Sequence, residues 1–252
     1  MTGMAGQYIE AMPPNAPPAA WFLPGQCAVC RGWAAARVCG DCRQRFAFTV
    51  ARCRRCAIDV PEGVTVCGAC LREPPPFDAA IAAVDYAFPW DALVRRLKFG
   101  AELDLAPALA ELVSAALRAS NTNPQVDCVV PMPLSEARLR ERGFNQAWEV
   151  ARRIARAFGW PADAGLLLRP RDTAHQVTLA HDKRIANVRG AFAVEPSRHA
   201  DVAGRDIALV DDVLTTGATA AEAATVLKRS GARSVQVWVV ARTPLPRDAD
   251  AT

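Results

Sequence analysis

The sequence has no apolar run long enough to cross a bilayer, and its first residues lack the basic start and apolar stretch of a secretion signal. These absences argue against membrane insertion and export, so we expect a cytoplasmic protein. The net charge is only +4, too little for a positive field over the whole surface. Any attraction to nucleic acid would therefore come from local groups.

Two common nucleotide-binding motifs are also missing. The sequence contains no G-x4-G-K-[ST] loop, and no G-x-G-x-x-G opens a predicted helix. The first absence excludes a P-loop nucleotidase, and the second argues against a dinucleotide-binding domain of the usual kind. A phosphorylated ligand would need a different loop.

Cysteine is the residue that the sequence has in excess. Eight of its nine cysteines form four C-x2-C pairs, namely Cys27/Cys30, Cys39/Cys42, Cys53/Cys56 and Cys67/Cys70. Without an export signal, this pairing favours metal ligation over disulfides. Two C-x2-C turns complete one tetrahedral thiolate shell, so four turns predict two structural zinc ions. The spacing leaves open whether the turns pair sequentially or interleave, and iron-sulfur binding or redox-active thiols are the alternatives.

Proline clusters suggest how the chain is divided. Residues 1–20 are rich in proline and small residues and are expected to form a disordered leader. Residues 21–73 carry the paired cysteines and form a small Cys-rich module. Three consecutive prolines at 74–76 predict a stiff linker, so that 74–245 would form the main domain and 246–252 a disordered tail.

The main domain alternates short apolar runs with helical patterns. Strands are expected at 79–88, 126–130, 207–210 and 235–241, and helices at 91–99, 105–117, 144–158 and 220–229. Such alternation is typical of an α/β fold, with a mostly parallel sheet flanked by helices. Cys128 falls in an apolar strand and is expected to be a buried, inert thiol.

The strand at 207–210 leads into a motif suited to a phosphorylated ribose. Residues 207–219 read IALVDDVLTTGAT, with two aspartates after the strand and a glycine-threonine turn before a helix. Backbone N–H groups at such a turn hold phosphate, and carboxylates accept hydrogen bonds from vicinal ribose hydroxyls. The alternative is a polar strand end followed by an ordinary capped helix.

The string VDDVLTTGAT resembles the phosphoribosyl-pyrophosphate (PRPP) binding motif of type I phosphoribosyltransferases. The resemblance implies that Asp211 and Asp212 are catalytic residues that hold the ribose hydroxyls. It also implies that PRPP and its 5'-phosphate bind at Val213, Leu214, Thr215, Thr216, Gly217, Ala218 and Thr219. Purine salvage enzymes carry an aspartate where this chain has Thr215, so hypoxanthine or guanine salvage is not the expected activity.

A second loop follows the strand at 126–130 and carries clustered arginines. Rigid prolines beside cations can form an anion site, and a pyrophosphate leaving group needs cations and magnesium nearby. The candidate pyrophosphate loop comprises Pro131, Met132, Pro133, Arg138, Arg142, Gly143, Asn145 and Gln146. The alternative is that these arginines only solvate the start of a helix.

Several strings together resemble the ComF family of phosphoribosyltransferase-like proteins, which is linked to natural competence. They are PMPLSEARLRERGFNQA at 131–147, LKFG at 97–100 and PPPFD at 74–78, and they occur in the family's order with the cysteine module over about 21–243. The resemblance implies a double zinc ribbon with sequential pairing of the cysteine turns. It also implies magnesium with PRPP, a role in DNA uptake, and partners such as a DNA-uptake helicase or processing proteins.

A segment between the two loops, residues 169–192, mixes polar residues with few core positions and is a candidate mobile cover, or hood. The family resemblance adds Arg171, Thr173, Gln176, Arg184 and Asn187 to the candidate site residues.

Three functions are compatible with these motifs. One is phosphoribosyl transfer from magnesium-PRPP, and the second is handling of single-stranded DNA in the same pocket. In the second case Arg52, Arg54 and Arg55 with Phe46 and Phe48 would add a stacking face, unless they form a solvated loop. The third is PRPP sensing without turnover. The acceptor cannot be read from the sequence, because acceptor contacts in such folds come from variable loops.

Overall fold

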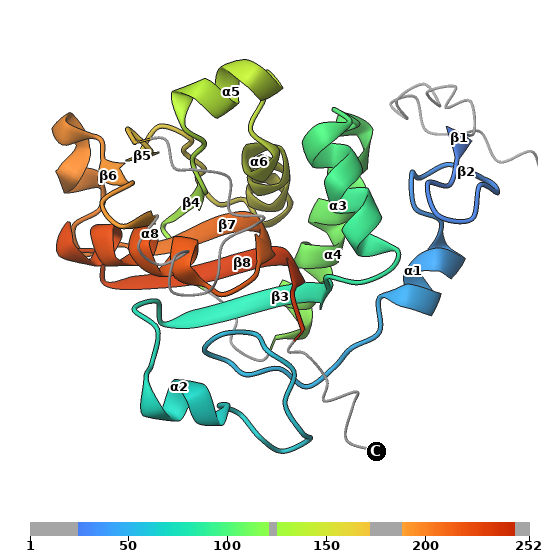
Figure 1. The fold of residues 1–252 in the computed structure, drawn as a ribbon, viewed down its shortest axis with the longest axis horizontal. Coiled ribbons are helices and arrows are strands. Elements are labelled where there is room, and N and C mark those ends of the chain that lie inside the picture. The colour runs from blue at the N-terminus through green and yellow to red at the C-terminus, as the bar shows by residue number, and fades with distance from the viewer. Residues whose placement is uncertain (1–24, 121–124, 172–187, 245–252) are drawn as a thin grey trace, which may run out of the picture.

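The computed structural model describes residues 25–120, 125–171 and 188–244 (Figure 1). The predicted leader at 1–20, the tail at 246–252 and the hood residues Thr173, Gln176, Arg184 and Asn187 lie outside the described residues. Within these three ranges, no helix has the length and apolar character needed to cross a membrane.

A sheet of four parallel strands forms the centre of the molecule. Its order is β3 (Ala79–Asp85), β8 (Ser234–Arg242), β7 (Asp206–Leu214) and β4 (Cys128–Pro131). Parallel strands need crossover connections, and helices supply them here. The structure thus confirms the predicted α/β class with a parallel sheet flanked by helices.

Helices cover both faces of this sheet. On one face, α4 (Ala106–Ala119) packs against α6 (Gln146–Phe158), and both contact the strands. On the other face, α8 (Ala218–Arg229) contacts β7 and β8. Side-chain alternation along the strands separates the two faces. In β7, Val210 packs in the core that contains α4 and α6, whereas its neighbour Leu209 packs in the core that contains α8.

The remaining elements are short. They are β1 (Gly25–Gln26), β2 (Trp33–Ala34), α1 (Gly40–Phe46), α2 (Gly68–Arg72), α3 (Trp90–Phe99), η1 (Leu103–Leu105), α5 (Glu136–Arg142), β5 (Leu167–Leu168), β6 (Ala193–Val194) and η3 (Pro196–Asp201). Two antiparallel pairs, β1 with β2 and β5 with β6, stand apart from the main sheet. Of these short elements, α3 and α5 carry residues of the candidate site.

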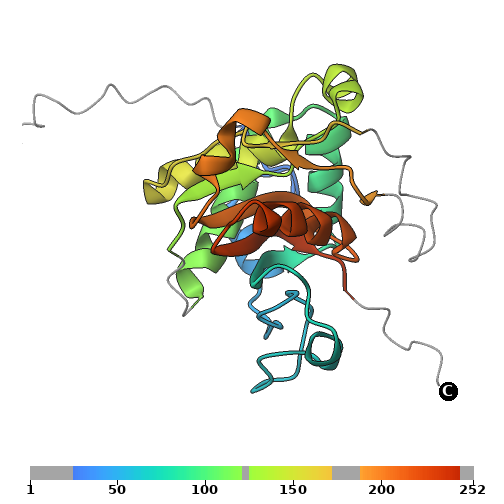
Figure 2. The same ribbon diagram turned by 90° about the vertical axis from the view of Figure 1, so that its left-hand side faces the viewer.

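The Cys-rich module packs on the main domain at two places. Cys27, Val38 and Cys42, from its first half, are buried in the same core as α3 and α4. Its second half lies beyond the edge strand β3, below the sheet in both views (Figures 1 and 2). There the N–H group of Ala80 donates to the carbonyl of Arg54 at 3.0 Å, so the module continues the hydrogen bonding of the sheet edge.

All eight predicted elements differ from the structure by at least one residue at one or both ends, and three of these differences are notable. The strand predicted at 79–88 ends at Asp85, and the helix predicted from 144 begins at Gln146, because the side chain of Asn145 caps it by accepting from the N–H group of Ala147 at 2.9 Å. The strand predicted at 207–210 continues to Leu214. Its partner β8 runs to Arg242 and pairs with Leu214, which extends the ladder past both aspartates.

Candidate functional site

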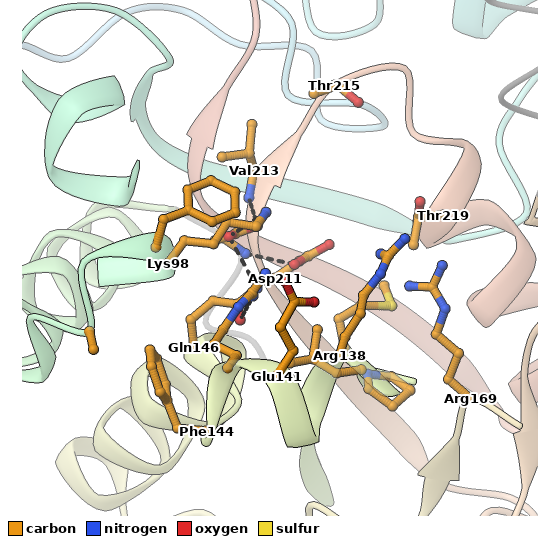
Figure 3. Close-up of a pocket in the computed structure, with 17 residues that line it drawn as sticks. Lys98, Arg138, Glu141, Phe144, Gln146, Arg169, Asp211, Val213, Thr215 and Thr219 are labelled. Atoms are coloured by element: carbon orange, nitrogen blue, oxygen red, sulfur yellow. Dashed lines mark hydrogen bonds and ion pairs between the residues drawn. The ribbon is translucent and has the colours of Figure 1, made fainter. Parts of the chain in front are cut away.

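A pocket of about 490 Å³ lies at the carboxyl ends of the parallel strands, the edge at which open α/β folds bind ligands. Three regions line it, and Figure 3 shows their side chains. The end of α3 contributes Lys98, Phe99 and Ala101. The β4 end with α5, α6 and β5 contributes Met132, Pro133, Leu134, Arg138, Glu141, Arg142, Phe144, Gln146 and Arg169. Strand β7 and the start of α8 contribute Asp211, Asp212, Val213, Thr215 and Thr219.

Asp212 is the buried member of the aspartate pair, with 4% of the residue exposed. Its Oδ2 atom lies 3.0 Å from Nζ of Lys98 and accepts a hydrogen bond from Nε2 of Gln146 at 3.2 Å. Burial works to raise the pKa of Asp212, but the charge and hydrogen bond of Lys98 outweigh it and lower that pKa. The other oxygen of Asp212, Oδ1, accepts the N–H group of Val213 at 2.9 Å, so Asp212 stays ionised in the interior because it has three partners.

Asp211 has the opposite electrostatic character. Burial raises its pKa to about 8, and the charge of Asp212 contributes in the same direction. Its Oδ1 atom accepts the N–H group of Asp212 at 2.8 Å. The pocket thus holds two adjacent carboxyl groups whose pKa values are moved in opposite directions, an arrangement typical of functional sites.

The loop at 215–219 lies between β7 and α8. Gly217 has φ of +85°, a left-handed conformation that favours glycine, and the side chain of Thr216 accepts the N–H group of Ala218 at 3.3 Å. No side chain caps α8 at Gly217, while the first turn of a helix has N–H groups without partners inside the helix. This geometry suits an anion at the start of α8.

Cationic side chains gather on the other walls. In Figure 3, Arg138 and Arg169 point toward Thr219 on one side of the pocket, and Lys98 lies on the other side of Asp211. Arg142 hydrogen-bonds Oε1 of Gln146 and lies over the ring of Phe99, with its Cζ atom 5.4 Å from the ring centroid. Arg142 is half-buried, and this burial lowers the pKa of its guanidinium.

The helix α5 positions the arginines, and the sequence analysis did not predict this helix. Ser135 caps its start by accepting the N–H group of Arg138 at 3.4 Å, and Gly143 ends it with φ of +80°. Arg138, Arg140 and Arg142 therefore lie within a separate short helix, and not at the start of the helix that was predicted. Arg138 and Arg142 nevertheless line the pocket, one helical turn apart.

Ten of the residues predicted for the two loops line this pocket. They are Met132, Pro133, Arg138, Arg142, Gln146, Asp211, Asp212, Val213, Thr215 and Thr219. The lining does not include the other seven: Pro131, Gly143, Asn145, Leu214, Thr216, Gly217 and Ala218. Asn145 and Gly217 shape helix ends, and Leu214 is a buried strand residue. Arg171, the described member of the predicted hood, is exposed and outside the lining.

Sequence reasoning missed several lining residues. Lys98 and Phe99 belong to the LKFG string, which was noted as a family match but given no role in the site. Arg169 is 8% exposed, and its guanidinium lies 5.3 Å from the ring centroid of Phe192. A cation inside a short apolar motif was the signal for Lys98. Glu141 and Phe144 likewise lie within the string at 131–147, which was noted as a family match, but neither was given a role in the site.

The eight paired cysteines form two groups. Cys27, Cys30, Cys39 and Cys42 make the first, and Cys53, Cys56, Cys67 and Cys70 make the second, with the sulfur atoms of each group within 4.8 Å of one another. Sequential pairing is thus confirmed. The Sγ atoms of Cys30 and Cys39 are 3.8 Å apart and those of Cys56 and Cys67 are 3.7 Å apart. A tetrahedral ion with Zn–S bonds of about 2.3 Å needs S–S separations of about 3.8 Å.

Backbone amides prepare both groups for a cation. The N–H group of Cys39 donates to Sγ of Cys27 at 3.4 Å, and the N–H group of Cys67 donates to Sγ of Cys53 at 3.3 Å. Burial opposes ionisation, but such bonds outweigh it and lower the pKa of Cys27 to about 6. The same balance lowers the pKa of Cys53 to about 7. Both groups therefore fit zinc in donor type and spacing.

Cys128 lies apart from both groups. It is buried in β4, and burial raises its pKa to about 11. An inert thiol was predicted there, and its burial agrees with that prediction.

The DNA-stacking face suggested for the second half of the Cys-rich module does not form around Arg52. The guanidinium of Arg52 makes ion pairs with Asp59 at 2.7 Å and Asp85 at 2.8 Å. Arg52 therefore fastens the module to the end of β3 and is not available as a phosphate ligand.

Comparison with known proteins agrees with these observations. Residues 19–71 match the double zinc ribbon domain family. A protein of Salmonella typhi named DNA utilization protein YhgH is 36% identical over 230 residues, which cover 88% of this chain and 98% of the relative. Competence protein F of Haemophilus influenzae is 30% identical over 227 residues, with the same coverage.

Solved structures that are similar to this chain share little sequence with it. A glutamine PRPP amidotransferase from B. subtilis is 20% identical, with a TM-score of 0.36 over 53% of this chain and 25% of that protein. An adenine phosphoribosyltransferase from Leishmania tarentolae is 14% identical, with a TM-score of 0.37 over 68% and 93%. The identity and coverage of the sequence relatives, together with the motif order, show that the chain belongs to the ComF family.

Proposed function

We propose that the pocket binds PRPP, or the ribose 5-phosphate part of a related ligand, and that the protein acts in the use of internalised single-stranded DNA. The observation that carries the proposal is the meeting of Asp211, Asp212 and the first turn of α8 in one pocket. A ribose 5-phosphate has vicinal hydroxyls at one end and a phosphate at the other. Carboxylates accept from the hydroxyls, and the helix start receives the phosphate.

The remaining walls supply charge for a diphosphate. Lys98, Arg138, Arg142 and Arg169 line the pocket together with the carboxyl groups. Clustered cations in a partly buried pocket favour a highly anionic group on electrostatic grounds. Magnesium would accompany the diphosphate, whose oxygens are the ligands the ion prefers, and Glu141 offers a further carboxylate in the lining.

The pocket also suits a transfer reaction. The bond between C1 of the ribose and the diphosphate oxygen breaks, and its electron pair leaves with the diphosphate. A nucleophilic atom of the acceptor forms the new bond to C1 and then loses its proton. Asp211 and Asp212 hold the ribose while charge develops at C1, and Arg138 and Arg142 stabilise the leaving diphosphate.

Calorimetry with PRPP and magnesium tests ligand binding. Wild-type protein is expected to bind, and Asp211→Asn/Asp212→Asn is expected to bind at least tenfold more weakly, because two acceptors for hydroxyl groups are weakened. The matched control is Asp91→Asn/Asp201→Asn, which also removes two carboxylates but outside the pocket lining. Undiminished binding by the pocket variant would contradict the proposal.

A second candidate is binding of single-stranded DNA without turnover. Phe99 is 65% exposed beside the cations of the pocket, and an exposed ring next to phosphate-binding side chains is typical of single-strand recognition. A gel shift at low salt, with and without PRPP as competitor, checks this function. Release of pyrophosphate with an acceptor present would favour the transferase, whereas PRPP binding without release would favour a PRPP sensor.

A further inference from the structure

Arg242 ends strand β8 and is buried, with 8% of the residue exposed. Its position lies behind the pocket, because β8 pairs with β7 up to the pair Leu214 and Arg242. An arginine with so little contact with water needs acceptors for its N–H groups. One acceptor is the carbonyl of the next residue, Thr243, at 2.7 Å, and the others come from two regions that are far apart in the sequence.

One region is the end of β7 with loop 215–219. Nη1 of Arg242 donates to the carbonyl of Leu214 at 2.9 Å and to the carbonyl of Thr215 at 2.5 Å. Leu214 is the last residue of β7, and Thr215 lines the pocket. The guanidinium therefore fixes the point at which the chain leaves the sheet and begins the loop.

The other region is the second zinc ribbon, formed around Cys53, Cys56, Cys67 and Cys70. Nε of Arg242 donates to the carbonyl of Cys56 at 2.9 Å. Cys56 is the second cysteine of its C-x2-C turn, so this carbonyl sits on a metal-binding turn. The Arg242 side chain thus donates hydrogen bonds both to the metal-binding turn at Cys56 and to the start of loop 215–219.

Charge strengthens this connection. Four thiolates and one Zn²⁺ have a net charge of −2, so a zinc-loaded second ribbon places an anion beside the buried guanidinium of Arg242. A buried cation is costly unless an anion or several acceptors compensate it. Loss of the metal would remove this compensation and loosen the turn that presents the Cys56 carbonyl.

We propose that the second zinc ribbon positions loop 215–219 through Arg242, so that the bound metal helps to fix the conformation of a loop that lines the pocket. Arg242 is a positioning residue, since it is outside the pocket lining and acts on the carbonyls of Leu214 and Thr215. The effect on ligand binding rests on the proposed PRPP function, whereas the effect on the order of the loop does not.

Hydrogen-deuterium exchange of the zinc-loaded full chain tests the connection. The variants are Arg242→Met, which keeps an unbranched apolar stem, and Cys67→Ser, which removes a ligand of the second ion. Both are expected to raise exchange of amides in 213–219 about tenfold, because charge-assisted hydrogen bonds that hold the loop are lost. In the double variant Arg242→Met/Cys67→Ser, these amides should exchange little faster than in Arg242→Met alone.

Two controls separate this connection from general damage. Cys39→Ser removes a ligand of the first ion, and Arg37→Ala breaks ion pairs that the first ribbon makes with Glu102 and Asp104, away from the second ribbon and the loop. Both should leave exchange in 213–219 within about twofold of wild type. The proposal is overturned if Cys67→Ser leaves these amides unchanged, or if both controls raise their exchange as much as Arg242→Met does.

Ligand binding is measured on the same proteins with PRPP and magnesium. Arg242→Met and Cys67→Ser should weaken binding about tenfold, and the controls should not. If wild-type protein binds no PRPP, the proposed function fails, but the exchange data still decide whether the second ribbon orders the loop. If PRPP binds and Arg242→Met binds it normally, the positioning role is refuted while the function stands.

Discussion

Nζ of Lys98 lies 3.0 Å from Oδ2 of Asp212, so that the last turn of α3 reaches the carboxyl-terminal part of β7 inside the pocket. This pair accounts for an ionised, buried carboxylate beside Asp211, whose pKa is raised. It also places a cation next to one of the two carboxyl groups proposed to hold ribose. Because ribose hydroxyls compete with Lys98 for the same carboxylate, this ion pair is the one that a bound ligand would disturb first.

Replacing Lys98 by Met is expected to destabilise the protein by about 2 kcal/mol, because the buried Asp212 carboxylate loses its cation. Partial exposure of the lysine keeps the cost below that of a fully buried pair. Chemical denaturation at pH 7 measures the change. Lys98→Arg keeps the positive charge and is the matched variant; an equal loss with both substitutions would show that packing, and not charge, matters at this position.

The pH dependence of stability should change in Asp211→Asn. The pKa of Asp211 is raised in the fold to about 8, whereas in the unfolded chain it has the ordinary aspartate value. The protein therefore loses stability as pH rises from the ordinary aspartate range toward 8, because the unfolded state gives up this proton first. Without ligand, the variant should be more stable than wild type by about 1–3 kcal/mol at pH 8. The difference should shrink toward pH 5, where wild-type Asp211 is protonated.

Thermal unfolding of both proteins at pH 5 and pH 8 measures this difference. The comparison between variant and wild type cancels the titration of other groups that the two proteins share. A difference that is the same at both pH values, or larger at pH 5, would refute the raised pKa. The same variant should bind PRPP more weakly, which would show that Asp211 lowers the stability of the unliganded protein but contributes to ligand binding.

Local patterns predicted much of this fold. The apolar runs gave the parallel sheet, and the C-x2-C spacing gave two metal sites, because both depend on periodicity or on short-range geometry. The length of β7 could not be predicted, because it depends on pairing with β8, a strand that α8 separates from β7 in the sequence. Ladder pairing between separate segments is a tertiary property.

The candidate site was predictable where one segment supplies it. Asp211, Asp212 and Thr219 come from a single string and do meet in the pocket. Lys98 and Arg169 enter from α3 and from the end of β5, and no local signal relates them to that string. The role of Arg242 was equally hidden, because its partners lie 28 and 186 residues away in sequence.

Metal analysis should find two zinc ions in each chain. Cys39→Ser and Cys67→Ser each remove one ligand from a different group and should each reduce the content to about one ion per chain. Cys128→Ser, outside both groups, should retain two. Elemental analysis of purified protein measures the content, and loss of both ions from either single variant would contradict independent sites.

A backbone effect is expected at Gly217. A Cβ atom there would meet no close neighbour, since the nearest is Cδ1 of Leu214 at 4.0 Å, but φ of +85° disfavours any side chain. Gly217→Ala should therefore cost about 1–2 kcal/mol through strain alone. Gly165→Ala is the control, because residue 165 has no positive φ and its Cβ would have a contact of 3.6 Å. Equal stability of the two variants in urea would refute the strain.

The division of the pocket into two anion sites can be tested with two ligands. Arg142 lines the wall proposed to hold the diphosphate, and Thr219 lines the start of α8, proposed to hold the 5'-phosphate. Arg142→Gln should weaken PRPP binding by about 1.5–3 kcal/mol, the usual contribution of a charged hydrogen bond, and leave ribose 5-phosphate nearly unaffected. Thr219→Val should weaken both ligands alike, by about 1 kcal/mol. Calorimetry with each ligand gives the four values, and equal losses for both ligands in Arg142→Gln would show that this arginine does not recognise the diphosphate.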